Sequence, residues 1–142
     1  MKNILITGAS QGIGKATAVE AAKNKMFVGI NYNKNLEAAQ SCIDEVKLAG
    51  GDGMILQCDV ADSNAVKVMF KKFLEKANTI DGVFNNAGIT GPISQIQDLD
   101  PAELKTLIDT NVSGAFYVAQ ESARAMINQN YGAIVNLSLI HI

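Results

Sequence analysis

The chain has 142 residues, 48% of them hydrophobic and 18% charged, with a formal net charge of −2. This size suits one domain of about 150 residues. The composition excludes disorder driven by low hydrophobicity. Fourteen acidic and twelve basic residues leave no positive surplus, which argues against a nucleic-acid partner. With one histidine and two cysteines, Cys42 and Cys58, the chain lacks the usual ligands of a zinc site, so we expect no metal, and reduced thiols in the cytoplasm.

The N-terminal apolar run ends at Gly8 and is too short for a signal-peptide core or a membrane span, so we expect no membrane anchor there. Further apolar runs alternate with amphipathic stretches, which predicts right-handed βαβ units and a parallel sheet. Strands are expected at residues 4–6, 27–30, 54–56, 83–84 and 132–137. Helices are expected at residues 12–25, 36–49, around 66–77, and 101–130 with a break near 111–114.

Signals for helix ends support these ranges. Gly50 and Gly51 follow the second expected helix, as glycine commonly does at helix C-termini. Asp100, Pro101 and Glu103 provide an N-cap, a first-turn proline and a first-turn acid for the last helix. Residues 88–98 before it contain glycine and proline and are expected to form a loop.

A glycine-rich stretch, Thr-Gly-Ala-Ser-Gln-Gly-Ile-Gly at residues 7–14, separates the first strand from the first helix. Glycines in this position let a pyrophosphate approach the backbone, and the positive end of the helix dipole faces the anion. A P-loop is excluded because five residues separate Gly8 from Gly14, and Ala16 stands where a magnesium-binding Ser or Thr belongs. We interpret the stretch as the phosphate-binding turn of a dinucleotide site.

Four further motifs accompany this turn. Asp59 and Val60 follow the third strand, Asn-Asn-Ala-Gly at residues 85–88 follows the fourth, Asn111 lies in the last helix, and Gly-Ala-Ile-Val-Asn-Leu-Ser at 132–138 contains the fifth strand. Together with TGxxxGIG, the set resembles the short-chain dehydrogenase/reductase family over residues 2–138. Within that family it is most similar to 3-oxoacyl-carrier-protein reductases and to sugar or polyol dehydrogenases.

The resemblance implies a Rossmann fold, a doubly wound parallel α/β sheet with strand order 3-2-1-4-5 and helices on both faces. Residues 1–136 would form an incomplete NAD(P)-binding domain, truncated before the family's C-terminal strands. The implied activity is hydride transfer between NADP(H) and the carbonyl or secondary alcohol of a small-molecule substrate. The complete protein would form a homo-oligomer.

The resemblance also assigns cofactor-binding roles. Residues 8–14 would cradle the pyrophosphate, with a hydroxyl from Ser10; Asp59 and the Val60 amide would bind adenine; residues 85–88 would stabilise the sheet and border the nicotinamide-side ribose. Read without the resemblance, residues 85–88 are also consistent with a left-handed turn, and Asp59 with a helix-start carboxylate. The complete set is Gly8, Ala9, Ser10, Gln11, Gly12, Ile13, Gly14, Tyr32, Asn33, Lys34, Asp59, Val60, Asn85, Asn86, Ala87 and Gly88.

The end of the second strand bears on the choice of cofactor. NAD-dependent enzymes place an acid there, which binds the ribose 2′-hydroxyl and repels a 2′-phosphate. Here Tyr32 occupies that position, followed by Asn33 and Lys34, so NADP(H) is favoured over NAD(H). Two observations weaken this choice: Gln11 stands where many NADP-dependent relatives carry a basic residue, and Lys34 is equally consistent with a solvated side chain.

The family's proton-transfer residues are missing from the printed sequence. The family uses a tyrosine whose pKa is lowered by a lysine four residues later, because a phenol near pKa 10 is a poor base at neutral pH. None of the three tyrosines is followed by lysine at that spacing. Ser138 matches the first serine of the family's Ser-Ser pair, but Leu139 replaces the catalytic second one. Only Asn111 remains, and it is also consistent with a core asparagine at a helix irregularity, so we expect an inactive chain.

Residues 137–142, Leu-Ser-Leu-Ile-His-Ile, depart abruptly from the family pattern. One reading frame of a transposon end used in DNA library preparation encodes the same six residues. We therefore expect a non-native tail after Asn136 and give His141 no functional weight.

Other classes stay open. One is a non-catalytic dinucleotide-binding or redox-sensing module, and another is a fragment without function. A sugar-nucleotide epimerase is a third, although those enzymes usually carry TGxxGxxG and Gly12 comes one place too late for that spacing.

Overall fold

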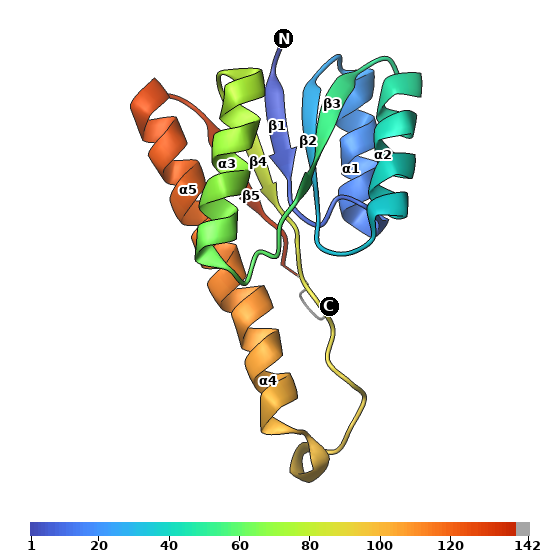
Figure 1. Cartoon of the computed structure of the whole chain (residues 1–142), viewed down its shortest axis with the longest axis vertical. Helices are drawn as coiled ribbons and strands as arrows, with labels where there is room; N and C mark the ends of the chain where they lie inside the picture. Colours follow the sequence, from blue (N-terminus) through green and yellow to red (C-terminus); the bar gives the residue numbers. More distant parts are fainter. Residues whose placement is uncertain (139–142) are drawn as a thin grey trace.

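The computed structural model describes residues 1–138, which form a five-stranded parallel sheet with helices on both faces (Figure 1). The sheet order is β3-β2-β1-β4-β5, so the predicted doubly wound Rossmann arrangement is confirmed. The strands are β1 (Asn3–Ile6), β2 (Phe27–Tyr32), β3 (Asp52–Gln57), β4 (Gly82–Asn85) and β5 (Ala133–Asn136).

The helices divide the core into two layers. On one side of the sheet lie α1 (Gly12–Lys23) and α2 (Leu36–Leu48), and on the other lie α3 (Ser63–Ala77) and α5 (Ala115–Gln129) (Figure 1). Val28 and Ile30 of β2 pack in the first layer, with α1 and α2. Phe27 packs in the second, where its ring centroid is 5.9 Å from that of Phe73.

All six residues of β2 are buried, as expected for a strand covered on both faces. Gly29 lies at its centre because a Cβ there would stand 2.6 Å from the Phe73 ring. The missing side chain lets α3 approach the sheet closely. The tight packing fixes the carboxyl end of β2, where Asn31 and Tyr32 begin the candidate site.

The predicted helix over residues 101–130 is confirmed together with its break. It comprises α4 (Pro101–Ile108), a π-helical segment η2 (Asp109–Gly114) and α5. A 3-10 turn, η1 (Ile96–Asp98), precedes it, and α4 projects beyond the end of the sheet together with the loop that leads to it (Figure 1). A Cβ on Gly114 would stand 2.8 Å from Val60 Cγ2, so the π segment packs closely against the segment that follows β3.

In residues 1–138, the helices fall short of the length and apolar character that a bilayer crossing requires. Leu139 and His141, which we discussed from the sequence, lie outside the described residues.

Candidate dinucleotide-binding site

A groove of about 380 Å³ opens at the carboxyl ends of β1 to β4. The strand order reverses between β1 and β4, and ligands of open α/β sheets bind at such a switch point. Each predicted cofactor motif contributes to the walls. The lining residues are Gly8, Ser10, Gln11, Asn31, Tyr32, Asn33, Lys34, Asn35, Cys58, Asp59, Val60, Ala87, Gly88, Ile89 and Thr110.

The glycine turn is closed toward the protein and open toward the groove. Gly8 has φ +62°, and a Cβ there would stand 2.9 Å from Ala87 Cα. A Cβ on Gly14 would stand 2.6 Å from both Gly8 O and Asn86 Nδ2. Gly12, at φ +56°, has no atom within 4 Å of its Cβ position. At Gly8 and Gly14 the turn therefore packs against Asn86 and Ala87, which follow β4, and it leaves open space at Gly12.

The N-terminus of α1 carries no side-chain cap. Asn35, Asp62 and Asp100 each cap their helix by accepting backbone N–H groups, whereas Gln11 makes no such bond at α1. The first N–H groups of a helix have no partner within it. Uncapped amides and open space beside Gly12 fit the pyrophosphate of a dinucleotide. The other first-turn residue of the motif, Ile13, is half exposed, and Ala9 is buried.

Lys15 does not belong to this anion site. Its Nζ lies 2.8 Å from Glu45 Oε1 on α2, in a salt bridge at the surface. The residue that mimics a P-loop lysine in the sequence is therefore directed toward α2.

Thr7 fastens the end of β4 to the glycine turn. Its Oγ1 accepts hydrogen bonds from the backbone N–H groups of Asn86 and Ala87, both at 3.0 Å. In return, Asn86 Nδ2 donates to Thr7 O at 2.8 Å and to Gly8 O at 3.2 Å. None of residues 85–88 has a positive φ, so the left-handed-turn interpretation is wrong. This stretch holds the two strand ends together.

Asn85 points away from the groove. Its Nδ2 donates to Ala115 O at 2.8 Å and to Asn136 Oδ1 at 3.0 Å. It therefore joins β4 to the start of α5 and to the end of β5. Gly88 lies at the groove rim beside Asn111, whose Oδ1 would be 3.3 Å from a Cβ at Gly88.

The wall of the groove that the sequence predicts to bind adenine is formed after β3. Asp59 is exposed and its Oδ1 accepts a hydrogen bond from Ala61 N at 3.0 Å, while Val60 is buried. The cap of α3 is Asp62, so the helix-start interpretation of Asp59 is wrong. Burial, followed by the charges of Asp59 and Asp62, raises the pKa of Cys58 to about 12. That thiol is thus protonated at neutral pH and is not a nucleophile.

The end of β2 forms the remaining wall. Tyr32 is 6% exposed, whereas Asn33 and Lys34 are exposed at the rim. Sequence reasoning missed Asn31, whose buried side chain binds the glycine turn. Its signal was available: a lone polar residue at the end of an apolar strand requires buried hydrogen-bond partners.

A second hollow of about 350 Å³ adjoins the groove and contains Asn111. Both ends of the Asn111 amide bind one backbone unit: Nδ2 donates to Ile89 O and Oδ1 accepts from Ile89 N, each at 2.8 Å. Asn111 is exposed, so the core-asparagine interpretation is wrong about burial and right about backbone bonding. The lining residues are Asn86, Ala87, Gly88, Ile89, Thr90, Asn111, Leu137 and Ser138.

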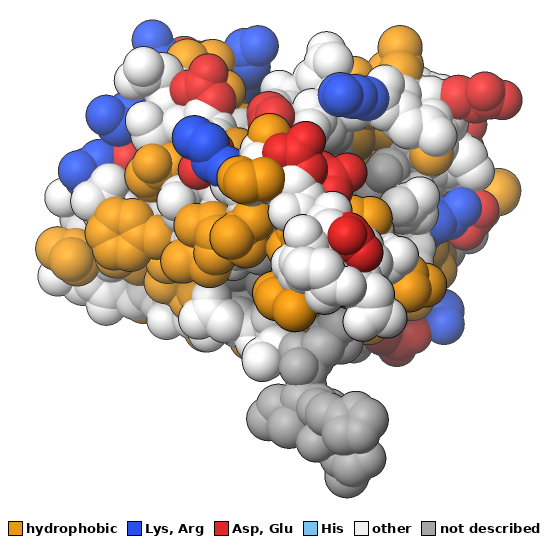
Figure 2. Space-filling view, turned by 90° about the horizontal axis from the view of Figure 1, so that it is seen from below, with side chains coloured by type: hydrophobic (Ala, Val, Ile, Leu, Met, Phe, Trp, Pro, Cys, Tyr) orange, Lys and Arg blue, Asp and Glu red, His pale blue; other side chains and the backbone are white. Residues whose placement is uncertain are grey.

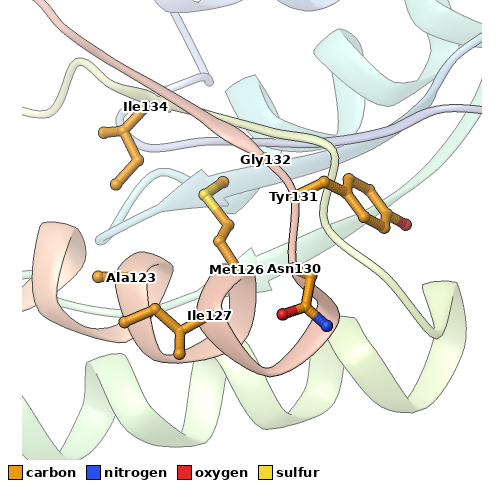
Figure 3. A pocket seen from close by; sticks show the side chains of 7 residues that line it. All are labelled: Ala123, Met126, Ile127, Asn130, Tyr131, Gly132 and Ile134. Atoms are coloured by element: carbon orange, nitrogen blue, oxygen red, sulfur yellow. The ribbon is translucent and has the colours of Figure 1, made fainter.

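A larger hollow of about 560 Å³ lies far from these motifs, where α5 ends and β5 begins (Figure 3). Met126 and Ile127 of α5 face it together with Ile134 of β5, and Tyr131 is its sole titratable residue. It lies at the amino end of β5, whereas the groove lies at the carboxyl ends. Within the described residues, no three His, Cys, Asp or Glu side chains gather as a metal site would require.

Comparison with known proteins identifies the family. The short-chain dehydrogenase family model matches residues 2–141. This chain belongs to the short-chain dehydrogenase family. The 3-oxoacyl-[acyl-carrier-protein] reductase FabG of Staphylococcus aureus is 37% identical over 139 residues, which are 98% of this chain and 56% of that protein.

Solved structures of the family agree with the fold. NAD+-bound xylitol dehydrogenase superposes with a TM-score of 0.91 at 35% identity, covering 95% of this chain and 52% of that one. A metagenomic short-chain oxidoreductase in complex with NADP gives a TM-score of 0.91 at 28% identity, covering 98% of this chain and 62% of that one. The chain thus spans between about half and three-fifths of the length of these relatives. Both nicotinamide cofactors occur among them.

Proposed function

We propose that the groove binds NADP(H) and that the protein is an oxidoreductase acting on a carbonyl or secondary alcohol. The observation that carries this proposal is the uncapped N-terminus of α1 beside the open turn at Gly12. The bound nicotinamide supplies or accepts the hydride. The chain's own residues hold the two ends of the dinucleotide: residues 8–14 at the pyrophosphate, Asp59 and Val60 at the adenine.

The preference for NADP(H) rests on the charge at the end of β2. No acidic side chain occurs among residues 31–35, and the exposed Lys34 lines the groove. An ammonium group there attracts a 2′-phosphate, while an acid would repel it. Relatives with NAD and with NADP both exist, so a binding measurement decides.

Isothermal titration calorimetry of the purified chain with NADPH and with NADH tests this preference. We expect NADPH to bind at least about tenfold more tightly than NADH. Lys34→Asp should bring the two affinities close to each other. Lys47→Asp is the matched control, because Lys47 is an exposed lysine in the last turn of α2, the helix that follows Lys34, and does not line the groove. Equal affinity for both cofactors, or an equal effect of both variants, would contradict the NADP(H) preference.

We further propose that the printed chain binds the cofactor without turnover. Asn111 has both ends of its amide committed to Ile89, and Tyr32, Tyr117 and Tyr131 lack a lysine four residues later. No residue described in the second hollow has a side chain suited to protonate a carbonyl oxygen at neutral pH. Oxidation of NADPH by the chain with a panel of ketones would refute this proposal.

We propose that a row of hydrophobic side chains along α4, η2 and α5 is the contact surface of a homo-oligomer. Leu104, Ile108, Val112 and Phe116 follow each other at intervals of four along α4, η2 and α5, each about half exposed. Hydrophobic side chains gather broadly on the surface seen from this end of the molecule (Figure 2). We expect Phe116→Glu to shift a homo-oligomer toward monomer in light scattering, and Val68→Glu on α3 to leave the oligomeric state unchanged.

The free, buried thiols of Cys42 and Cys58 support a cytoplasmic location.

A further inference from the structure

Asn31, near the end of β2, is 2% exposed and uses its whole side-chain amide. Its Oδ1 accepts a hydrogen bond from Gly8 N at 3.1 Å. Its Nδ2 donates to Leu56 O at 3.2 Å and to Cys58 O at 3.0 Å. The orientation of the amide follows from this chemistry, because a backbone N–H requires the oxygen and two carbonyl groups require the nitrogen.

The backbone of Asn31 extends the same contact. Its carbonyl accepts a hydrogen bond from Ala9 N at 2.8 Å. The first two amides of the glycine turn therefore both point toward β2 rather than into the groove. This fixes the direction in which the chain leaves β1, and hence where the uncapped amides of α1 lie.

Asn31 also reaches the opposite wall of the groove. It binds the carbonyl of Leu56, near the end of β3, and that of Cys58, which immediately precedes Asp59 and Val60. One buried side chain thus connects the pyrophosphate turn to the proposed adenine segment across the end of β2. No other residue type of this size offers an acceptor to Gly8 and a donor to both carbonyls; aspartate would place its charge against them.

We propose that Asn31 is a positioning residue that sets the distance between the glycine turn and the segment of residues 58–60, and thereby the affinity for ligands that span both. The proposal rests on the proposed dinucleotide-binding function. It assigns Asn31 no direct chemistry, since it acts through the two segments it holds. A ligand that occupies only the adenine side should be nearly indifferent to its loss.

The test compares NADPH, which would span both segments, with adenosine, which has the adenine base but no phosphate group for the glycine turn or Lys34 to bind. For Asn31→Ala we expect NADPH affinity to fall about tenfold or more and adenosine affinity to change less than about twofold. Asn31→Ser is the second variant, in case the alanine variant does not fold. Equal loss for both ligands, or no loss for either, overturns the positioning role.

Asn3 provides the matched control for a merely structural effect. It is also a buried asparagine, 7% exposed, and its Nδ2 donates to Ala77 O at 3.1 Å and Thr79 Oγ1 at 2.9 Å at the other end of the sheet. Asn3→Ala should lower the melting temperature yet leave the ratio of the two affinities unchanged. A comparable change of that ratio in Asn3→Ala would overturn the assignment.

Two further outcomes distinguish a failure of the proposed dinucleotide-binding function from a failure of the positioning role of Asn31. If the unmodified chain binds neither ligand, the proposed function fails, whatever Asn31 does. Hydrogen exchange of the ligand-free chain then still tests the geometry, because the Gly8 and Ala9 amides should exchange as slowly as the core strands. Fast exchange at both amides overturns the inference even if no variant folds.

Discussion

The strands β2 and β5 belong to the same parallel sheet but differ in their surroundings. All six residues of β2 are buried between α1 and α2 on one side and α3 on the other. In β5, one of the two outer strands of the described sheet, three of four residues are exposed, and Val135 keeps 57% of its surface. Parallel pairing therefore occurs both for a strand inside the core and for a strand at its margin.

The polar groups at the strand ends follow the same division. Around β1 and β2, Thr7, Asn31 and Asn86 bind backbone groups of neighbouring strands and close the glycine turn from behind. Around β5, two hollows of about 350 and 560 Å³ remain open at the surface. The groove side of the sheet is thus held together by these hydrogen bonds, and we expect substitutions there to lower stability more than substitutions at β5.

Gly14→Ala should have the largest effect. The new Cβ would stand 2.6 Å from Gly8 O and 3.0 Å from Ala9 Cα, and neither backbone atom can move without opening the turn. We expect a loss of about 3 kcal/mol or more in unfolding free energy and loss of NADPH binding. Urea denaturation measures the first and calorimetry the second. Gly82→Ala is the control, since its Cβ would meet its nearest atom at 3.7 Å; similar losses in both variants would break the comparison.

Thr7→Val keeps the shape of the side chain but removes the acceptor of two partly buried N–H groups, those of Asn86 and Ala87. We expect a loss of about 2–3 kcal/mol in denaturation, because each unsatisfied donor carries its desolvation cost. Thr106→Val is the matched control: its hydroxyl donates to Ala102 O on the exposed α4, where water replaces the bond. A Thr7 variant as stable as the control would show that the network does not stabilise the turn.

Valine truncation on the two strands compares them directly. Val28→Ala on β2 removes two fully buried methyl groups and should cost about 2 kcal/mol. Val135→Ala on β5 should cost less than about 0.5 kcal/mol, because the side chain is largely solvated. Thermal or urea unfolding of both variants gives the difference. Equal costs would mean that β5 is covered in solution.

Local sequence patterns predicted the strands, the helices and a break near residues 111–114, which the structure places at Asp109–Gly114, because each depends on neighbours a few positions away. The motifs also predicted that residues 8–14, 32–34, 59–60 and 85–88 form one site. Members of all four segments line the groove, whereas Asn85 and Asn86 bind neighbouring strands and do not line it. The partners of Asn31, Thr7 and Asn111 were not predictable in this way. They are backbone groups up to 80 positions distant in the chain, and no pattern in the sequence names them.

The sequence by itself determined the alternating βα order, the family motifs and the lack of a Tyr-Lys pair at the required spacing. Those properties follow from periodicity, glycine spacing and residue type. Only the tertiary structure decided which polar side chains hold the walls of the groove together by hydrogen bonds and which line the groove. The reason is that parallel strands bring their carboxyl ends together, so that Asn31 meets Gly8, Leu56 and Cys58 only after β1, β2 and β3 have paired.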